Sequence, residues 1–304
     1  MGYRMLKLLR ITNWTTKHGF INLLHQIRNL KMFDTPVIEE FRTGNSSITD
    51  SEYLSSYPSL CGSAAKDDEI FRKFRSAKVM VEALDHVSIE QGKIYLSEIL
   101  KFGSWTKDFT NVIDKIDSIG TPREFRFAPY GTFSPTLLRY LKIHLDLENI
   151  FGQLQMLNIV EIGVGFGGQA SVIGFLDQPL SYSFYDIPPV LELVKKFLNE
   201  IEVPGNFRYL DGRDPEISKP DLVVSNYAFS ELNRGVQESY LNNVILNSSR
   251  GYITWNSLSA DNLGGYSLAE LLRLIPNSQI LPERPCTAEQ NVIIVWGGLK
   301  EGLY

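Results

Sequence analysis

The chain has 304 residues, of which 43% are hydrophobic and 21% charged, and its formal net charge is −5. This composition is that of an ordinary globular protein with room for one large domain or two modest ones, and it excludes disordered and fibrous classes. The acidic balance argues against a nucleic-acid partner, and no apolar run is long enough to cross a bilayer. Cys61 and Cys286 lie far apart without metal-binding spacing and predict reduced thiols in a cytoplasmic protein.

The first 33 residues contain no acidic side chain, and six basic ones are interleaved with apolar residues. The apolar part is too short and too interrupted for a secretory signal. We expect an amphipathic helix that packs on its own protein or on a second subunit, which favours a homo-oligomer. The alternative is a peripheral contact with an anionic membrane surface.

Residues 1–145 lack the alternation typical of strands and predict a helical region that caps a substrate pocket and contributes to oligomerisation. Helical patterns cover 67–87 and 134–152, separated by polar stretches rich in turn-forming residues. In the second pattern, Ser134 is expected to cap a helix whose first residue is Pro135.

From about residue 155, short apolar strands alternate with helices, which predicts a mostly parallel sheet covered on both faces. The expected strands are 157–162, 181–187, 206–211, 221–226 and 251–256, and the expected helices are 169–176, 188–200, 230–249 and 267–275. Two final strands, 278–283 and 291–297, have no helix between them and predict an antiparallel hairpin at one edge. The sequence therefore predicts an α/β, Rossmann-like, doubly wound domain over residues 146–304.

The stretch NIVEIGVGFGGQ places four glycines within six residues, between a buried strand and a helix. A strand, a glycine turn and a helix together let backbone amides approach a ligand at the helix start. Gly163, Gly165 and Gly168 fit the dinucleotide pattern G-x-G-x-x-G. Glu161 with Gly163, Gly165 and Gly167 fits E-x-G-x-G-x-G equally well, so the turn alone leaves the ligand open.

Three features favour one ligand. The carboxylate of Glu161 suits a cationic amino group and not a pyrophosphate. Asp186 closes the next strand 23 residues after Gly163, where a carboxylate binds ribose hydroxyls. The expected edge hairpin takes the place of the second βαβαβ half that a dinucleotide needs. S-adenosylmethionine carries an amino acid and an adenosine but no phosphate, and it matches all three features.

At these motifs the chain resembles class I S-adenosylmethionine-dependent methyltransferases. The blocks FSPTLLRYLK and SNYAFSEL resemble more narrowly the sugar O-methyltransferases of bacterial surface-glycan gene clusters, over about residues 120–297. The resemblance implies a seven-stranded methyltransferase sheet and methyl transfer to a hydroxyl of a sugar, sugar nucleotide or glycan, in O-antigen, capsule or glycoside biosynthesis. Two alternatives stay open: an NAD(P)-dependent oxidoreductase using the same turn, and a non-catalytic binding protein that keeps the fold.

The predicted cofactor-binding residues are the glycine turn, its two acids and the polar ends of the neighbouring strands. They are Glu161, Gly163, Gly165, Gly167, Gln169, Asp186, Ile187, Asp211, Gly212, Ser225 and Asn226. The resemblance implies that Asp211 and Gly212 meet the adenine amine.

Methyl transfer from a sulfonium needs mainly a hydroxyl held in line, helped by a base because a sugar hydroxyl is a weak nucleophile. No histidine follows His144, so the predicted base is Glu231, with Tyr130 and His144 next. The predicted substrate contacts are Tyr130, Ser134, Arg139, Tyr227 and Asn256, with Arg139 facing an anionic group. A less favoured alternative is an all-oxygen Mg²⁺ site formed by Asp261 and Asn262 with Glu231 or Asn226.

Overall fold

A computed structural model describes residues 56–256, 264–288 and 290–298, which belong to one compact unit of the chain. The basic segment within residues 1–33 and the Asp261–Asn262 loop lie outside the described residues. Among the helices described, none combines the length and the apolar character needed to cross a membrane.

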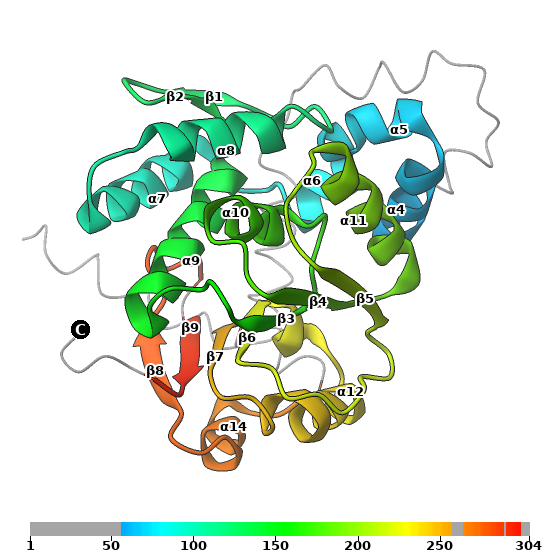
Figure 1. Ribbon diagram of the computed structural model, residues 1–304, viewed down its shortest axis with the longest axis vertical. Coiled ribbons are helices and arrows are strands. Elements are labelled where there is room, and N and C mark those ends of the chain that lie inside the picture. Colours follow the sequence, from blue (N-terminus) through cyan, green and yellow to red (C-terminus); the bar gives the residue numbers. More distant parts are fainter. Residues whose placement is uncertain (1–55, 257–263, 289, 299–304) are drawn as a thin grey trace, which may run out of the picture. The chain divides into compact units, whose positions relative to one another are not determined.

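Seven strands form one sheet in the order β5-β4-β3-β6-β7-β9-β8 (Figure 1). Their bounds are β3 Asn158–Ile162, β4 Ser181–Asp186, β5 Phe207–Asp211, β6 Leu222–Asn226, β7 Gly251–Trp255, β8 Gln279–Pro282 and β9 Val292–Trp296. The strands from β5 to β7 pair in parallel, whereas β9 is antiparallel to both β7 and β8. The predicted fold class, a mostly parallel doubly wound sheet with an antiparallel hairpin at its edge, is confirmed.

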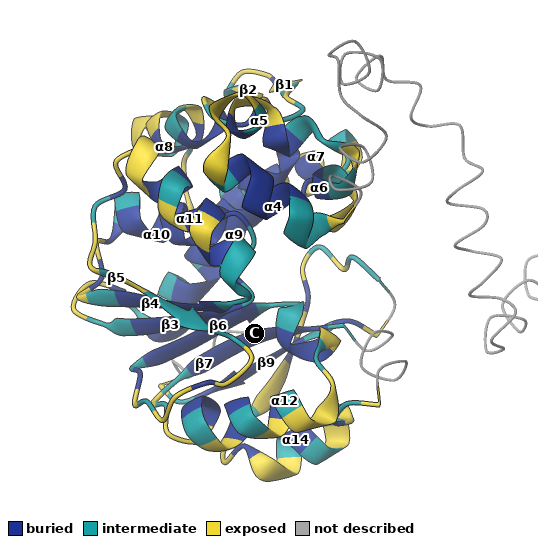
Figure 2. Ribbon diagram, turned by 90° about the vertical axis from the view of Figure 1, so that its right-hand side faces the viewer, coloured by how far each residue is buried: buried dark blue, intermediate teal, exposed yellow. Residues whose placement is uncertain are grey.

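Helices cover both faces of this sheet because its strands are apolar on both sides (Figures 1 and 2). On one face lie α9 Pro135–Phe151, α10 Gly168–Leu176 and α11 Pro188–Glu200. On the other lie α12 Arg234–Tyr240, the π-helical turn η3 Leu241–Ile245 and α14 Leu268–Leu274. In α10, seven consecutive residues from Gly168 to Gly174 are buried, because the helix is enclosed by the sheet and by further helices.

The described residues before α9 form a helical cap, with one small hairpin that the sequence did not predict. The cap consists of α4 Tyr57–Lys66, α5 Asp68–Lys73, η1 Phe74–Ser76, α6 Lys78–Ala83, α7 Ile89–Phe102, α8 Lys107–Asp117, β1 Phe125–Phe127 and β2 Gly131–Phe133. The strands β1 and β2 have three residues each, too few for an alternating pattern to be visible in the sequence.

Two predicted helices are divided. The pattern at 67–87 becomes α5, η1 and α6, because Ala77 is extended and starts α6 anew. The pattern at 230–249 is broken near its start, because Leu232 and Asn233 are extended and the Asn233 side chain caps α12 at Val236 N–H; α12 then continues directly into η3. Both breaks lie at one or two residues whose side chains or backbone serve another element, which periodicity does not reveal.

Pro135 begins α9 as predicted, but Ser134 makes no side-chain cap. Its hydroxyl instead accepts from Arg75 at 3.1 Å and donates to Asp117 at 2.8 Å, both in the cap. α9 includes residues 145 and 146, where the sequence places the boundary between the two regions; that division stays a prediction.

Candidate functional site

The glycine turn joins β3 to α10 and needs glycine for its backbone. Gly163, Gly165 and Gly167 have φ values of 75°, 59° and 91°, in the left-handed region that other residues avoid. A Cβ on Gly163 would lie 2.0 Å from the Cβ of Ala228, so the turn is pressed against the chain that follows β6. The turn thus sits between the ends of two adjacent strands, where the order of the sheet reverses.

Residues of the helical cap and of α9 lie against this turn. A Cβ on Gly165 would be 3.0 Å from a methyl group of Leu84, and one on Gly168 would be 2.5 Å from the ring of Tyr140. The rings of Tyr140 and Phe166 meet edge to face, 6.0 Å apart. The turn is therefore flanked by α9 and by the end of α6.

Asp186 ends β4 beside the turn and is held by backbone amides. Its two carboxylate oxygens accept from Val164 N–H at 2.9 Å and Ile187 N–H at 2.8 Å. Burial raises the pKa of Asp186 to about 6, although these amides act in the opposite direction. The carboxylate still has free lone pairs for ribose hydroxyls. Next to it, the Gly212 amide donates to the Asp186 carbonyl, which brings the end of β5 to the same edge.

Glu161 lies within β3 with 2% of its surface exposed. Tyr182 donates to its Oε2 at 2.9 Å, and burial raises the pKa of Glu161 to about 8. Among the described residues, no Lys, Arg or His forms an ion pair with the Glu161 carboxylate. A cationic ligand group would favour its ionised form.

Two buried amide side chains at the site lack a partner for one of their atoms. Oε1 of Gln169, in the first turn of α10, and Nδ2 of Asn226, at the end of β6, make no hydrogen bond with the described part of the chain. Leaving such a group unsatisfied costs about 1–3 kcal/mol, so both atoms indicate a polar ligand at this edge.

Two other predicted cofactor residues also make contacts within the protein. Ser225 is fully buried; its hydroxyl donates to the Ile162 carbonyl and accepts from Phe229 N–H, which fixes the end of β6 to the end of β3. Asp211 is paired with Arg213, which lowers its pKa, and remains at the surface. Ser225 therefore positions the end of β6 beside the turn, and its contact with a cofactor stays a prediction.

Tyr227, directly after β6, has a φ of 68°, which is strained for a bulky residue. Such strain costs about 1–3 kcal/mol and persists only where neighbours enforce it. Here Tyr227 N–H donates to the Thr254 carbonyl at 3.0 Å, and its own carbonyl accepts from Ser230. The conformation directs the phenol to Glu283, to which it donates.

The structure adds Glu283, which the sequence analysis did not identify as a site residue. This residue is 8% exposed and lines a cavity together with Arg139 and Tyr227. It follows β8, and β8 ends at the same edge as β7 because both are antiparallel to β9. An acid directly after the first strand of the expected hairpin was the only available signal.

The structure does not bring Tyr130 or Ser134 to the turn. Tyr130 lies between β1 and β2 and packs on Trp105 with ring centroids 5.5 Å apart. Figures 1 and 2 both place this hairpin away from the sheet, across the cap helices. Ser134 is buried in its network with Arg75 and Asp117. This placement does not support Tyr130 as a base or either residue as a substrate contact, and these roles stay predictions.

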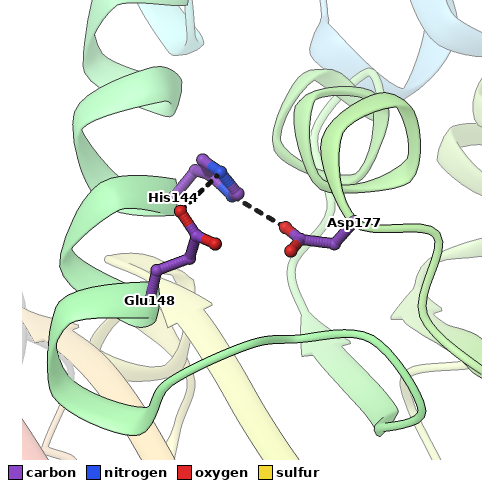
Figure 3. Close-up of side chains that lie close together, drawn as sticks. All are labelled: His144, Glu148 and Asp177. Carbon is purple, nitrogen blue, oxygen red and sulfur yellow. Dashed lines mark ion pairs between the residues drawn. The ribbon is translucent and has the colours of Figure 1, made fainter.

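His144 is equally remote, because it lies beside the far end of α10. Its ring is between two carboxylates, with Nε2 3.4 Å from Glu148 and Nδ1 3.2 Å from Asp177, the residue after α10 (Figure 3). About 13 Å of helix separates that end from Gly168. The two acids lie at opposite ring nitrogens, and the contact with Asp177 joins α9 to α10. This position does not support His144 as the base, and that role stays a prediction.

Glu231 and Asn256 stay near the edge of the sheet. Glu231 ends the short helix η2 Ala228–Glu231 and is exposed, and partial loss of solvation raises its pKa. Asn256 follows β7, and its N–H donates to Ser230 Oγ at 3.1 Å. Arg139, on α9, directs its guanidinium toward Tyr227, with 6.0 Å between them.

Comparison with known proteins gives only distant matches. No protein-family model and no curated protein matches the chain. Among solved structures, protein 1320 of Thermoplasma acidophilum is 15% identical over 65% of this chain and 100% of its own, with a TM-score of 0.39. The CurJ carbon methyltransferase is 16% identical over 54% of each chain, with a TM-score of 0.39.

A third match is NcsB1, an O-methyltransferase from neocarzinostatin biosynthesis solved with S-adenosyl-L-homocysteine and 1,4-dihydroxy-2-naphthoic acid. It is 14% identical over 54% of this chain and 58% of its own, with a TM-score of 0.37. The chain spans little more than half the length of these two methyltransferases. Carbon and O-methyltransferases are thus among the structures similar to this chain, at a likeness too low to say what it binds or transfers.

Proposed function

We propose that the chain is an S-adenosylmethionine-dependent O-methyltransferase whose acceptor is a sugar hydroxyl. The observation that carries this proposal is the meeting of the glycine turn with Asp186 at the carboxyl ends of β3 and β4, next to the point between β3 and β6 where the strand order reverses. Ligands of doubly wound sheets bind at that reversal.

The residues at the turn fit this methyl donor by their chemistry. Buried Glu161 suits its ammonium group, and Asp186 suits its ribose hydroxyls. The unpartnered amide atoms of Gln169 and Asn226 offer an acceptor and a donor beside them. Asp211 and Gly212, at the end of β5, are proposed to meet the adenine amine, with Ile187 beside the ribose. When bound, the donor supplies an electrophilic methyl group.

The acceptor side rests on Arg139, Tyr227 and Asn256, together with the resemblance of FSPTLLRYLK and SNYAFSEL to sugar O-methyltransferases. Tyr227 offers a phenol and an aromatic face, and Asn256 an amide, both suited to sugar hydroxyls. Arg139 suits an anionic group of a sugar nucleotide or acidic glycan. A role in surface-glycan or glycoside biosynthesis follows from this acceptor class.

Binding of the donor tests the proposal by thermal shift and calorimetry. S-adenosylmethionine and S-adenosylhomocysteine should each stabilise the protein, because a ligand that binds only the folded state raises its stability by mass action. NAD should not. Stabilisation by NAD alone would favour an oxidoreductase, and stabilisation by none of the three would favour a non-catalytic protein.

Asn226→Ala locates the site. Among the described residues its side chain forms one hydrogen bond, which its Oδ1 accepts from Thr254 at 3.4 Å, so the folded protein should lose little stability. Loss of one hydrogen bond should weaken S-adenosylhomocysteine binding about 3- to 10-fold. Asn199→Ala, at an exposed position of α11, is the matched control and should bind unchanged. Equal affinity in both variants would place the ligand elsewhere.

A further inference from the structure

A small cavity lies between α9 and the carboxyl edge of the sheet, beside Tyr227. Its volume is about 10 Å³, and its lining includes Tyr95, Arg139, Tyr227, Thr254 and Glu283. This is room for one water molecule or one hydroxyl group. Tyr227 links it to the glycine turn, since its neighbour Ala228 packs on Gly163.

Glu283 is nine-tenths buried at this cavity and is held by two neighbours. Tyr227 Oη donates to Oε1, and Thr287 contributes its N–H at 2.9 Å and its hydroxyl at 2.8 Å to Oε2. A carboxylate has about four lone-pair sites, and three donated hydrogens leave one site for a further donor. That site is available to a hydroxyl in the cavity.

Arg139 places an uncompensated positive charge beside the same cavity. Its guanidinium donates to the Leu84 carbonyl at 3.0 Å, and no carboxylate of the described residues lies within 4.0 Å of it. The other buried cation at the cavity, Lys142, is already paired with Asp146 at 2.5 Å. A buried guanidinium without a counter-ion favours an anionic ligand.

We propose that Glu283 is the base of the reaction and that the acceptor is an acidic sugar, a uronic acid or a sugar phosphate, whose anionic group binds Arg139. This inference rests on the proposed methyl transfer. It assigns to Glu283 the role of base that the sequence analysis gave to Glu231. Glu231 is exposed, and among the described residues it forms no hydrogen bond or ion pair with Arg139 or Tyr227.

The step balances without a further reactant. The acceptor hydroxyl gives its proton to Glu283 while its oxygen forms a bond to the methyl carbon. The bond between that carbon and the donor sulfur breaks, and its electron pair stays on sulfur, which leaves S-adenosylhomocysteine and a neutral Glu283. Tyr227 and Thr287 hold the carboxylate during this exchange, and Glu283 then returns its proton to solvent.

The test measures transfer of a labelled methyl group from S-adenosylmethionine to methyl glucuronide, glucose 1-phosphate and methyl glucoside. The native protein should prefer either acidic sugar over the neutral one, and Arg139→Gln should remove this preference by raising KM about 10-fold or more, as expected for a lost charged hydrogen bond. Glu283→Gln should lower kcat by ~10²–10⁴-fold, the usual effect of losing a general base.

Two further variants keep the result interpretable. Glu192→Gln, at an exposed position of α11, is the matched control and should retain full turnover. Tyr227→Phe keeps the ring and removes one hydrogen-bond donor to Glu283, so kcat should fall while the affinity for S-adenosylhomocysteine stays unchanged. This variant tests the role of Glu283 independently of whether Glu283→Gln folds.

The outcomes separate this inference from the proposed function. Absence of S-adenosylhomocysteine binding by the native protein removes both. With the donor bound, absence of transfer to the acidic sugars overturns the acceptor class. Full turnover in Tyr227→Phe and Glu283→Gln, with loss in Glu231→Gln, overturns Glu283 as the base and supports Glu231.

Discussion

Burial of Glu161 should make the free energy of unfolding fall as pH rises, whereas a carboxylate whose pKa is lowered by folding makes it rise. Its pKa rises to about 8 in the folded protein from an ordinary value of 4.5. Between these values the folded state holds a proton that the unfolded state has lost. The stabilisation is therefore complete below about pH 4.5 and falls as pH rises toward 8.

We predict that the free energy of unfolding falls by about 2 kcal/mol between pH 6 and pH 8, from 1.36 kcal/mol per pKa unit over this window. Denaturant unfolding at several pH values measures it. Asp186, with a pKa of about 6, contributes mainly below this window. Glu161→Gln cannot titrate, so its stability should be nearly flat from pH 6 to pH 8. An equal slope in both proteins would contradict the burial argument.

At Gly163 the conformation and the space available act together. An alanine there would have its Cβ 2.0 Å from that of Ala228 at a φ of 75°. Left-handed backbone costs about 1–2 kcal/mol and overpacking about 1–3 kcal/mol, so Gly163→Ala should lose roughly 2–5 kcal/mol in denaturant unfolding.

Gly235→Ala is the matched control for this change. Gly235 lies in α12 with an open surface, and the nearest atom to its Cβ would be Asn233 Oδ1 at 3.6 Å. Alanine is the better helix former by about 1 kcal/mol, so this variant should gain stability. Similar changes in the free energy of unfolding for Gly163→Ala and Gly235→Ala would mean that the turn at Gly163 shifts to accommodate the added methyl group.

The turn and its acids were predictable from sequence because they occupy two consecutive strand–helix units. Glu161, Gly163 and Asp186 come together through local order alone, once parallel pairing is assumed. Glu283 was not predictable, because its approach to Tyr227 depends on how the loop after β8 folds back across the sheet edge. The helix cap predicted for Ser134 does not form for a related reason, because its hydroxyl donates to Asp117, which belongs to another helix.

At the scale of elements, one buried cation connects three parts of the cap. Arg75, in η1, donates to Asp85 at 3.0 Å after α6, to Asp117 at 2.9 Å at the end of α8, and to Ser134 at 3.1 Å before α9. All of these side chains are buried. Two acids share one guanidinium, so its removal leaves both of them unpaired.

Arg75→Met should therefore cost about 3–5 kcal/mol, the usual loss when one member of a buried ion pair is removed. Urea unfolding of the variant and of the native protein measures the loss. Lys78→Met is the control: Lys78 lies 3.8 Å from Glu82 with both side chains exposed, and such pairs contribute less than about 1 kcal/mol. A cost as small as that of Lys78→Met would contradict the network.

The arrangement of elements was predictable where each strand or helix has its own apolar period, as in β3–α10–β4–α11. The prediction failed where a single residue ends one element because its side chain or backbone is needed by the next. Asn233 interrupts the predicted helix at 230–249 because it caps α12. The hairpin β1–β2 escaped because a pair of three-residue strands has almost no period to detect.

At the scale of the whole described unit, the cap and one face of the sheet share a single core. Phe74 of the cap lies 6.0 Å from the Phe166 ring in the glycine turn and 6.1 Å from the Phe197 ring in α11. Cap residues such as Leu60 belong to the same buried cluster as Ile159 of β3. A shared core of this kind favours unfolding as one cooperative unit.

We predict that slowly exchanging amides of α4 and of β3 report the same free energy of opening by hydrogen exchange, because neither part keeps its core without the other. Phe74→Ala should lower both values by about 3–5 kcal/mol, the usual cost of deleting a buried ring. Phe102→Ala is the control, since Phe102 ends α7 with 41% of its surface exposed and should change both little. If Phe74→Ala weakened α4 alone while β3 kept its protection, the cap would be a separately unfolding element. Donor binding at the turn would then leave α4 unprotected. In the cooperative case, S-adenosylhomocysteine should protect α4 and β3 equally.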